Sequence, residues 1–518
     1  DVETLGSTSA INTDKTGTLT MNQMMASTLF INGAWFAVEG AGYRKTGAIT
    51  SVAGAEVPDF TRLALGLVLD SDATVADDGS VVGDPTEAAL VVLAAKLGVD
   101  AEETRRAYPR LAEVPFDSDY KFMATFHRYQ VSGVDRVIEL VKGAPDVVLA
   151  RCSLSGGSLT GAQTPVAQVK ADIDAANARM GQKGLRVLAF AARFVEEHEI
   201  ATMTSDPMAL TQDLTFVGMA GIIDPLRAEA KSAVRTALEA GIDVRMITGD
   251  HAVTAEAIGE MLALGSGVIS GPELQALPDE ELARRLPQLH VFGRVAPEDK
   301  LRLAKLMQQD GQVVAMTGDA VNDAAALKQA DVGVAMGSGS EVSKQAAKIV
   351  LTDDNFATLV RAVDLGRDIY RRISTYIRLQ LTILSSVLQL MVYATILNIN
   401  GGVALFPLQL LFCKFFVVIT VVIGFIVDVP DPGVMQRPPR KPGTKIVTRP
   451  WIIRWFIFGF VVAATALSVL EWGPGKPSTT HASVNMTMAF AIVSLSAVNI
   501  GLVMRRERQA PWSSPVFP

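Results

Sequence analysis

The sequence has little cysteine and no excess of positive charge. Its 518 residues include two cysteines, Cys152 and Cys413, which lie far apart and form neither a disulfide framework nor a metal-ligand spacing. The formal net charge of -7 argues against a nucleic-acid-binding surface, so we expect no nucleic-acid partner. The chain begins at Asp1 without an initiating methionine or a signal-peptide pattern, and we therefore expect a fragment of a longer protein.

Acidic residues are also nearly absent from four long apolar runs near the C-terminal end, roughly residues 379–399, 403–427, 451–470 and 484–504, where Glu471 lies at an edge. Each run has about the 20 residues that a bilayer-spanning helix requires. Basic residues flank the runs on one side only: Arg361, Arg367, Arg371, Arg372 and Arg378, then Arg437, Arg440, Lys441, Lys445 and Arg449, then Arg505, Arg506 and Arg508. The runs therefore predict four transmembrane helices in a lipid bilayer. The positive-inside rule places the soluble domains in the cytoplasm. The alternative is a set of buried core helices.

The remainder reads as strands alternating with helices, the pattern of a parallel sheet covered on both faces. Three short apolar strands each end in a polar cluster. The clusters begin at Thr13-Asp14-Lys15, at Thr248-Gly249-Asp250 and at Thr317-Gly318-Asp319. Ligands bind at the carboxyl ends of strands in open sheets of this kind, so we expect the three clusters to converge on one site.

The first cluster continues as Asp14-Lys15-Thr16-Gly17-Thr18-Leu19-Thr20. An aspartate at a strand end can attack a phosphorus atom and form an acyl-phosphate, which divides one difficult step into two easier ones. The lysine beside it can offset phosphate charge, and Gly17 lets the turn approach closely.

This heptapeptide is the signature of P-type ATPases, and the sequence resembles that family from end to end. The resemblance implies a haloacid-dehalogenase-like, doubly wound α/β phosphorylation domain in two segments, residues 1–25 and 224–365. It also implies an inserted α+β nucleotide-binding domain at 26–223, and an all-α region of stalk and four transmembrane helices at 366–518. The implied activity is ATP hydrolysis coupled to cation translocation through an aspartyl-phosphate on Asp14, with ATP and Mg²⁺ as cofactors.

The resemblance also assigns roles within the polar clusters. Asp14, Asp319 and the carbonyl of Thr16 would bind Mg²⁺, which prefers hard oxygen ligands. Thr248 and Gly249 would donate to the phosphoryl oxygens, and Lys300 would neutralise the transferring phosphate. The set is completed by Lys15, Asp250, Asn322 and Asp323.

The insertion resembles the nucleotide-binding domain of the family through Lys142-Gly143-Ala144-Pro145-Asp146 and the stretch from Phe116 to Lys121. Gly143 would belong to the ATP loop and Lys142 would line the adenine pocket. Phe116 would stack on the base with Lys121 nearby; a packed core position is the plain alternative for Phe116. Glu87 would accept a hydrogen bond from the base, and Arg186 would reach the phosphates.

The length of the insertion, its Lys-Gly-Ala-Pro loop and the basic loop 435–440 resemble calcium-pump-like (type II) members, but two residues near Asp319 depart from the family pattern. Ala320 stands where the family has glycine, and Ala325 where it has proline. An alanine at 320 would cost on the order of 1–3 kcal/mol if the backbone there had a positive φ, and little otherwise. We expect slowed rather than abolished phosphorylation, with a gain in Ala320→Gly.

The larger departure lies in the membrane. Val418, Gln389 and Ala497 occupy positions at which calcium pumps carry carboxylates, and Ser386 replaces an asparagine. A divalent cation in a bilayer needs anionic oxygen ligands, so these helices alone offer a non-standard ion site built from Gln389, Ser386 and Lys414. Lys414 could act as a built-in counter-cation or pair with a carboxylate from helices outside this chain, and snorkelling to the surface is the third possibility.

Three hypotheses of function follow. The first is a cation pump of calcium-pump-like lineage whose transported ion the sequence does not identify. The second is a soluble phosphatase or phosphotransferase, which the four spans disfavour. The third is a non-transporting pseudo-pump or regulatory membrane protein that keeps the ATPase shell. For the first, we expect an N-terminal actuator domain and further membrane helices outside this chain, and a composition rich in Ala and Val suggests a bacterial cytoplasmic membrane.

Overall fold

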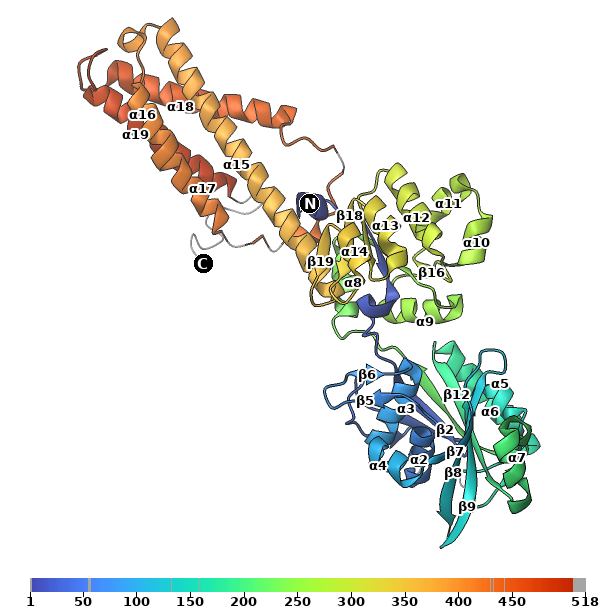
Figure 1. Cartoon of the computed structure of the whole chain (residues 1–518). Helices are drawn as coiled ribbons and strands as arrows, with labels where there is room; N and C mark the ends of the chain where they lie inside the picture. The colour runs from blue at the N-terminus through green and yellow to red at the C-terminus, as the bar shows by residue number, and fades with distance from the viewer. Residues whose placement is uncertain are drawn as a thin grey trace.

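The computed structural model of this chain describes residues 2–54, 57–131, 133–157, 159–428, 430–431, 433–441 and 443–505. A mixed α/β part, a parallel-sheet part and a bundle of long helices follow one another along the molecule (Figure 1). The predicted basic residues Arg506 and Arg508 lie outside the described residues.

The middle part is built on a seven-stranded sheet in which every pairing is parallel, in the order β15-β16-β14-β1-β17-β18-β19. Strands β17 and β18 are buried along their whole length and β14 at every residue but its first, as expected for a sheet with helices on both faces. The strands are β1 (Ala10–Asp14), β14 (Asp243–Ile247), β15 (Val268–Ser270), β16 (Val291–Gly293), β17 (Val314–Gly318), β18 (Val332–Met336) and β19 (Ile349–Leu351).

Helices on the two faces of this sheet bury two separate apolar clusters, one with α8 and α9 and the other with α12 and α13. The predicted parallel α/β fold is therefore confirmed. The helices of this part are α1 (Val2–Gly6), α8 (Ala230–Glu239), α9 (Ala252–Leu262), α10 (Gly271–Ala276), α11 (Asp279–Arg285), α12 (Pro297–Gln309), α13 (Ala324–Gln329) and α14 (Glu341–Ala346).

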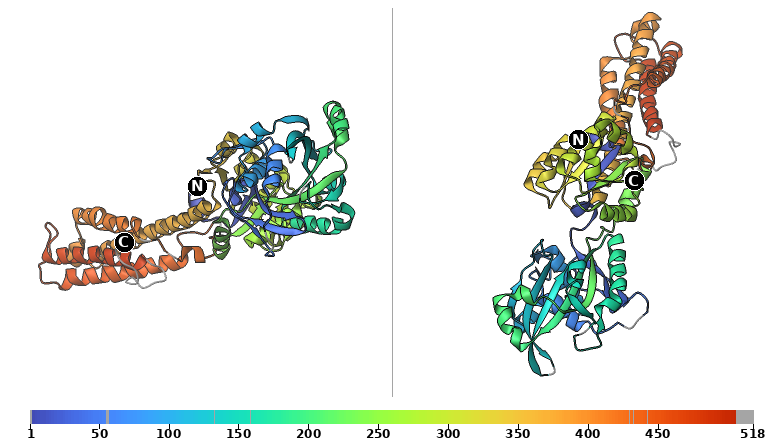
Figure 2. Two further views of the ribbon diagram at one scale, coloured as in Figure 1. Left: turned by 90° about the horizontal axis from the view of Figure 1, so that it is seen from below. Right: turned by 90° about the vertical axis from the view of Figure 1, so that its right-hand side faces the viewer.

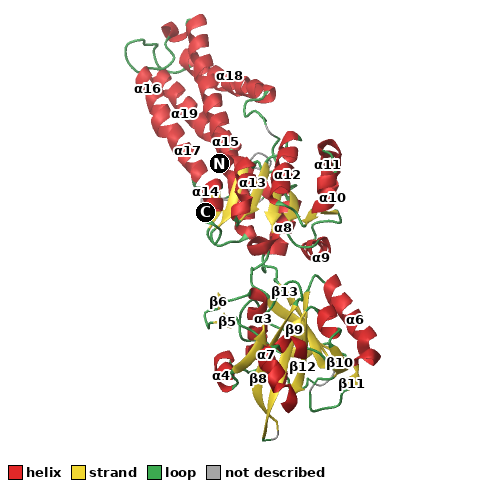
Figure 3. Ribbon diagram, turned by 45° about the vertical axis from the view of Figure 1, so that its right-hand side comes forward, coloured by secondary structure: helices red, strands yellow, loops and turns green. Residues whose placement is uncertain are grey.

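The second sheet has ten strands, runs mostly antiparallel and lies entirely between β1 and α8 in sequence. Figure 3 shows its strands with helices on either side. The main strands are β2 (Met25–Ile31), β3 (Ala34–Val38), β4 (Ile49–Ser51), β7 (Arg110–Val114), β8 (Phe122–Val131), β9 (Val134–Gly143), β12 (Arg186–Val195) and β13 (Leu214–Ile223), with β10 (Cys152–Ser155) and β11 (Thr164–Pro165) at one side. A separate pair consists of β5 (Thr74–Val75) and β6 (Val81–Val82).

One face of this sheet packs against α2 (Thr61–Leu69) and α3 (Pro85–Lys96), followed by α4 (Ala101–Ala107). The other face packs against α5 (Pro145–Leu149), α6 (Val166–Gln182) and α7 (Ile200–Ser205). The predicted α+β class of the inserted domain is likewise confirmed, and the structure adds that its sheet is mostly antiparallel.

The chain crosses between the two sheets twice, and the two crossings are tied to each other. Thr20 pairs with Leu226 in an antiparallel bridge, and the Thr20 hydroxyl donates to Asp224 Oδ2 at 2.5 Å. The backbone N–H of Gln23 donates to Asp224 Oδ1 at 3.2 Å. This buried carboxylate therefore fastens the outgoing strand to the returning one at the narrow joint visible in Figure 2.

In the part of the chain that the structure describes, four helices are long and apolar enough to cross a membrane. The first, α15 (Phe356–Ile396), begins inside the soluble part, so stalk and first span form one helix of 41 residues that ends earlier than the predicted run. The second starts at Pro407 rather than 403 and consists of α16 (Pro407–Phe412), a π-helical stretch (Cys413–Val418) and α17 (Ile419–Ile426). The others are α18 (Arg449–Trp472) and α19 (Val484–Met504).

Candidate active site

Asp14 lies at the carboxyl end of β1, between β14 and β17. The clusters that follow these two neighbouring strands therefore meet beside it, because parallel strands end at the same edge of the sheet. The backbone N–H of Asp14 donates to Thr317 Oγ1 at 3.0 Å, and the Thr317 hydroxyl donates to Thr13 Oγ1 at 3.1 Å. These buried hydroxyls fix the end of β1 against β17.

Lys300 connects two of the carboxylates. It lies in the first turn of α12, and its amine donates to Asp14 Oδ2 at 2.6 Å and to Asp323 Oδ1 at 2.8 Å. Burial disfavours the charged amine, but the two carboxylates outweigh burial and raise the pKa of Lys300. For Asp14, burial raises the pKa and Lys300 opposes that rise.

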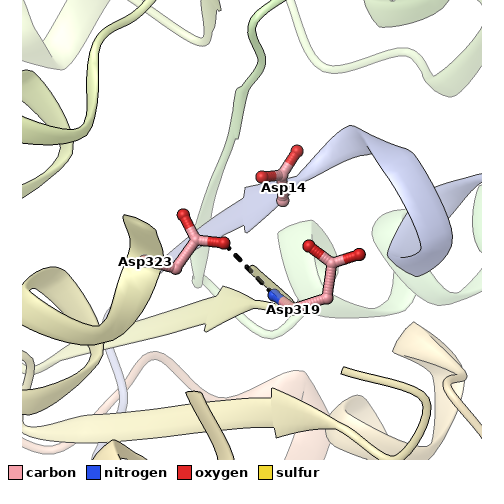
Figure 4. Close-up of side chains that lie close together, drawn as sticks. All are labelled: Asp14, Asp319 and Asp323. Carbon is pink, nitrogen blue, oxygen red and sulfur yellow. Dashed lines mark hydrogen bonds between the residues drawn. The ribbon is translucent and has the colours of Figure 1, made fainter. Parts of the chain in front are cut away.

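Three carboxylates gather at this point. Oxygens of Asp14, Asp319 and Asp323 lie within 4.8 Å of one another (Figure 4). Asp323 Oδ2 accepts the backbone N–H groups of Asp319 and Ala320, each at 3.2 Å, so Asp323 is held as part of the loop. Burial, with the charges of Asp14 and Asp323, raises the pKa of Asp319. A hard divalent cation such as Mg²⁺ fits this all-oxygen donor set.

The turn after Asp14 requires glycine at position 17. Gly17 has φ +71°, and a Cβ there would lie 3.3 Å from Asp319 Oδ2. Its carbonyl accepts a hydrogen bond from Arg227 at 3.0 Å. Thr16 precedes it with an extended backbone. The turn can therefore pass close to the carboxylate cluster because no side chain intervenes.

Of the remaining predicted residues, Lys15, Thr248 and Asp250 are linked by hydrogen bonds, whereas Gly249 and Asn322 are exposed. Lys15 is buried and donates to Asp250 Oδ2 at 2.6 Å, and the backbone N–H of Asp250 donates to Thr248 Oγ1 at 3.1 Å. The Thr248 hydroxyl keeps its own hydrogen for another acceptor. Gly249 and Asn322 are exposed, and the Asn322 side chain makes no hydrogen bond with the part of the chain that the structure describes.

The backbone at Ala320 is extended, with φ −94° and ψ 159°, so the condition for strain is not met and the expected handicap has no structural basis. Ala325 lies in α13, where alanine is a good helix former. We now expect Ala320→Gly to form phosphoenzyme at the same initial rate within about twofold, because it relieves no unfavourable φ. Rapid-quench measurement of both proteins checks this, and a gain of fivefold or more in the variant would contradict it.

In the inserted domain, the structure brings Lys142 and Glu87 into contact. The buried amine of Lys142 donates to Glu87 Oε1 at 2.8 Å and also to the carbonyl oxygen of Asp70. Glu87 Oε2 accepts the backbone N–H groups of Asp72 at 2.8 Å and Ala73 at 3.1 Å. Both predicted adenine-pocket residues are thus anchored to the loop 70–73, which the sequence analysis missed because nothing in the primary structure singles it out.

The Phe116–Lys121 stretch lies beside the end of β9. The backbone N–H of Ala144 donates to the Lys121 carbonyl at 3.0 Å, and a Cβ on Gly143 would lie 2.5 Å from that oxygen, so Gly143 permits the close approach. Phe116 is 62% exposed, which excludes a packed core position for its ring.

Arg186 faces the joint between the two sheets. Its guanidinium donates to Thr86 Oγ1 at 2.9 Å. Together with Lys15 and Asp250 it lines a cleft of about 300 Å³, so a cation of the inserted domain and the charged pair next to Asp14 share one open space.

Among the described residues, no hydrogen bond joins the three predicted membrane-site residues to one another. The Gln389 amide donates to Ser385 Oγ at 3.0 Å and to the Phe456 carbonyl of α18 at 3.3 Å. The Ser386 hydroxyl donates to the Thr382 carbonyl of its own helix at 2.9 Å. Lys414 lies in the π-helical stretch, and its amine donates to Gln380 Oε1 on α15 at 3.3 Å.

Comparisons with known proteins agree with this geometry. Three family models match: "P-type ATPase, cytoplasmic domain N" over residues 60–229, "Cation transporting ATPase, C-terminus" over 402–518, and "haloacid dehalogenase-like hydrolase" over 301–363. A cation-transporting ATPase of Synechocystis is 36% identical over 96% of this chain and 55% of its own length. Calcium-transporting ATPases of Listeria monocytogenes (38% over 100% of the chain and 56% of the relative) and Bacillus subtilis (36% over 96% and 56%) are similar as well.

The chain spans about half the length of the curated relatives it matches. The matched models cover the inserted domain, part of the parallel-sheet domain and the apolar helices, and the relatives align with nearly every residue. The chain belongs to the family of P-type cation-transporting ATPases, within its calcium-ATPase-like lineage.

Proposed function

We propose that the whole protein is an ATP-driven cation pump that phosphorylates Asp14 from Mg-ATP. The observation that supports this most directly is the placement of Asp14 at 2.6 Å from Lys300, next to Asp319 and Asp323. Phosphoryl transfer depends mainly on positioning and charge neutralisation, and these residues supply both.

In this proposal, Asp14 Oδ1 or Oδ2 attacks the γ-phosphorus of ATP, and the bond from phosphorus to the ADP oxygen breaks. Lys300 moves its contact from the free carboxylate to the transferring phosphoryl oxygens, while Asp323 holds the lysine in place. Thr248 and the Gly249 N–H donate to the same oxygens. A Mg²⁺ ion held by Asp14, Asp319 and the Thr16 carbonyl would neutralise phosphate charge.

The inserted domain would hold the nucleoside. Phe116 would stack on adenine, Lys121, Gly143 and the Lys142–Glu87 pair would form the pocket around the base, and Arg186 would meet the phosphates in the cleft that it shares with Lys15. The exposed ring of Phe116 and the position of Arg186 support this assignment. ATP then spans the joint between the two domains.

The test is acid-stable labelling of the chain by ATP labelled at the γ-phosphate. We expect label that is released by hydroxylamine, which cleaves acyl-phosphates, and that disappears when Mg²⁺ is chelated. Stable label that resists hydroxylamine would contradict an aspartyl-phosphate.

We further propose that the membrane ion site is not of the ordinary calcium type. Val418 and Ala497 are buried where calcium pumps have carboxylates, and the Gln389 amide is engaged with α18. In the described parts of the four apolar runs, 379–399, 403–427, 451–470 and 484–504, there is no carboxylate, and Glu471 lies just beyond the third run, at the end of α18. Lys414 then supplies a fixed positive charge inside the membrane.

We therefore expect that micromolar calcium will not stimulate phosphorylation of the full-length protein. A screen of monovalent and divalent cations against ATPase activity checks this, with each ion added to the same chelated preparation. An increase of tenfold or more with calcium alone would contradict the proposal.

The same membrane residues favour one alternative, a non-transporting protein that keeps the ATPase shell. The two functions differ in their response to cations: a pump is stimulated by its ion, whereas the alternative hydrolyses ATP at a rate that no ion in the screen changes. We also propose that an actuator domain and further membrane helices complete the protein, and that it resides in a bacterial cytoplasmic membrane. The described basic residues at the ends of α15 to α19 support cytoplasmic soluble domains.

A further inference from the structure

A cavity of about 220 Å³ lies where α15 leaves the parallel-sheet part, beside α1 and the loop 434–440. The first two segments meet closely, since a Cβ on Gly6 of α1 would lie 2.4 Å from the carbonyl carbon of Gly366 in α15. α1 is followed by β1, which ends at Asp14, and α15 continues into the first membrane span (Figure 1). The cavity is therefore at the joint that connects the phosphorylation site to the membrane helices.

The walls of this cavity are rich in arginine, and none of the described residues that line it is a carboxylate. The arginines are Arg367, Arg371 and Arg378 of α15, with Arg437 and Arg440 of the loop. A concentration of one sign of charge around an open space attracts ions of the opposite sign. The cavity therefore favours an anion.

On α15, two arginines share one carboxylate and a third forms no salt bridge within the described residues. Arg371 and Arg372 both contact Asp368, at 2.8 and 2.6 Å. The buried guanidinium of Arg367 donates to three backbone carbonyl oxygens, those of Ala240, Val434 and Arg437. Asp364, on the same helix, acts on Arg367 at longer range. Because carbonyl oxygens carry only a partial charge, the charge of Arg367 is incompletely compensated.

Arg440 forms the opposite wall and is held there by neutral groups. Its guanidinium lies 3.7 Å from the centre of the Tyr370 ring and donates to Ser7 Oγ at 2.8 Å. Its carboxylate partner, Glu3, is exposed and 3.7 Å away. Such a weak, solvated ion pair leaves most of the positive charge available to an anion in the cavity.

Two buried polar groups of the wall also lack hydrogen-bond partners among the described residues. Ser374 is 5% exposed, and its hydroxyl is unpaired. The Nε–H of Arg367, a residue that is 9% exposed, is unpaired as well. Buried polar groups are nearly always paired in folded proteins, because leaving them unpaired is unfavourable. An anion with several acceptor oxygens supplies the partners that the described residues do not.

We propose that this cavity binds a phosphate group, which braces α1, α15 and the loop 434–440 against one another. Guanidinium groups match phosphate oxygens in bidentate geometry and keep their charge at all physiological pH values. The cavity lies at the end of the spans that carries the basic residues and has room for several water-sized groups. The phosphate group therefore belongs either to inorganic phosphate or to the head group of an anionic phospholipid.

Binding is measured by the thermal unfolding midpoint of the full-length protein in nanodiscs of neutral phosphatidylcholine. Inorganic phosphate replaces chloride at constant ionic strength, and Mg²⁺ is chelated so that phosphate is not recruited to the carboxylates around Asp14. A ligand that binds the folded state raises the midpoint. We expect a rise of at least about 2 °C in wild type at saturating phosphate.

Two variants change the wall in different ways. Arg440→Gln removes one cation, and we expect it to weaken phosphate binding at least fivefold. Ser374→Ala removes only the unpaired hydroxyl, so it should not lower the midpoint without phosphate, yet it should weaken binding at least twofold. The matched control, Arg284→Gln, removes an exposed arginine of α11 and should leave the affinity unchanged. Because Ser374→Ala retains the fold, it decides the test even where Arg440→Gln does not fold.

The source of the phosphate group is decided with nanodiscs that contain phosphatidic acid, in buffer without phosphate. If the ligand is a lipid head group, this lipid raises the midpoint of wild type more than that of Arg440→Gln or Ser374→Ala, and added phosphate has no further effect. If the ligand is free phosphate, the lipid shifts all proteins equally and only added phosphate separates them.

The site is overturned if neither inorganic phosphate nor phosphatidic acid separates wild type from the two cavity variants, or if Arg284→Gln weakens binding as much as they do. None of these measurements uses ATP or the phosphorylation of Asp14. Their outcome is therefore independent of the proposed function, which fails or stands on the labelling experiment.

Discussion

Asp14→Asn is expected to form no phosphoenzyme, a decrease of more than about 10⁴-fold, because the amide cannot attack phosphorus. The variant should fold normally. Burial raises the pKa of Asp14, so the ionised side chain is costly in the folded state, and Lys300 keeps Asp323 as its partner after the substitution. Labelling with γ-labelled ATP and a thermal unfolding curve measure the two expectations separately.

The matched control is Asp172→Asn, which removes a carboxylate from the exposed face of α6 in the inserted domain. It should retain wild-type labelling. Substantial hydroxylamine-sensitive labelling of Asp14→Asn would place the acceptor elsewhere and would overturn the proposed role of Asp14.

Lys300→Met is expected to lower the rate of phosphorylation by about 10²- to 10³-fold, the range found when one electrostatic group is removed from a transition state. The buried amine contacts both Asp14 and Asp323, and no other cation forms a salt bridge with either of them among the described residues. Its loss leaves three neighbouring carboxylates without this compensating charge.

The residual activity of Lys300→Met should also depend differently on pH. Lys300 lowers the pKa of Asp14, so its removal raises that pKa further. The nucleophile is the ionised form, and the acid limb of the rate profile should therefore move to higher pH. Rates of phosphoenzyme formation measured from acid to mildly alkaline pH show the displacement.

Lys305→Met provides the control on the same helix. Lys305 is exposed, and the same change there should alter neither the rate nor the profile. Lys300→Arg should recover part of the rate, since a guanidinium retains the charge in altered geometry. An unshifted acid limb in Lys300→Met would contradict an electrostatic role toward Asp14.

The convergence of the three polar clusters could be predicted from the sequence because it follows from topology. Parallel strands end at one edge of a sheet, so residues after β1, β14 and β17 must lie together whatever the length of chain between them. The four C-terminal apolar helices could also be predicted, because apolarity and flanking charge are read from short stretches of sequence. The residues at which these helices begin and end were less predictable, since α15 continues without a break from the soluble part into the apolar run.

Loop backbone conformation and side-chain partners could not be predicted in the same way. Ala320 looked like a source of strain until its backbone proved to be extended, and φ at one residue depends on the whole loop around Asp323. Gln389 occupies an ion-site position in the sequence, yet its amide is engaged with Ser385 and with α18. Helical periodicity shows which residues share a face but not which neighbour that face meets.

The sequence by itself determined the chemistry of this protein: an aspartate in a phosphorylation signature, the oxygen and amine groups around it, and four apolar runs with no carboxylate except Glu471 at an edge. These are properties of residue type and of short spacing, which a linear pattern records. Only the tertiary structure decided how Lys300 is shared between Asp14 and Asp323, and how the loop 70–73 anchors Lys142. Such contacts join residues tens to hundreds of positions apart, and packing selects them from many alternatives of similar local energy.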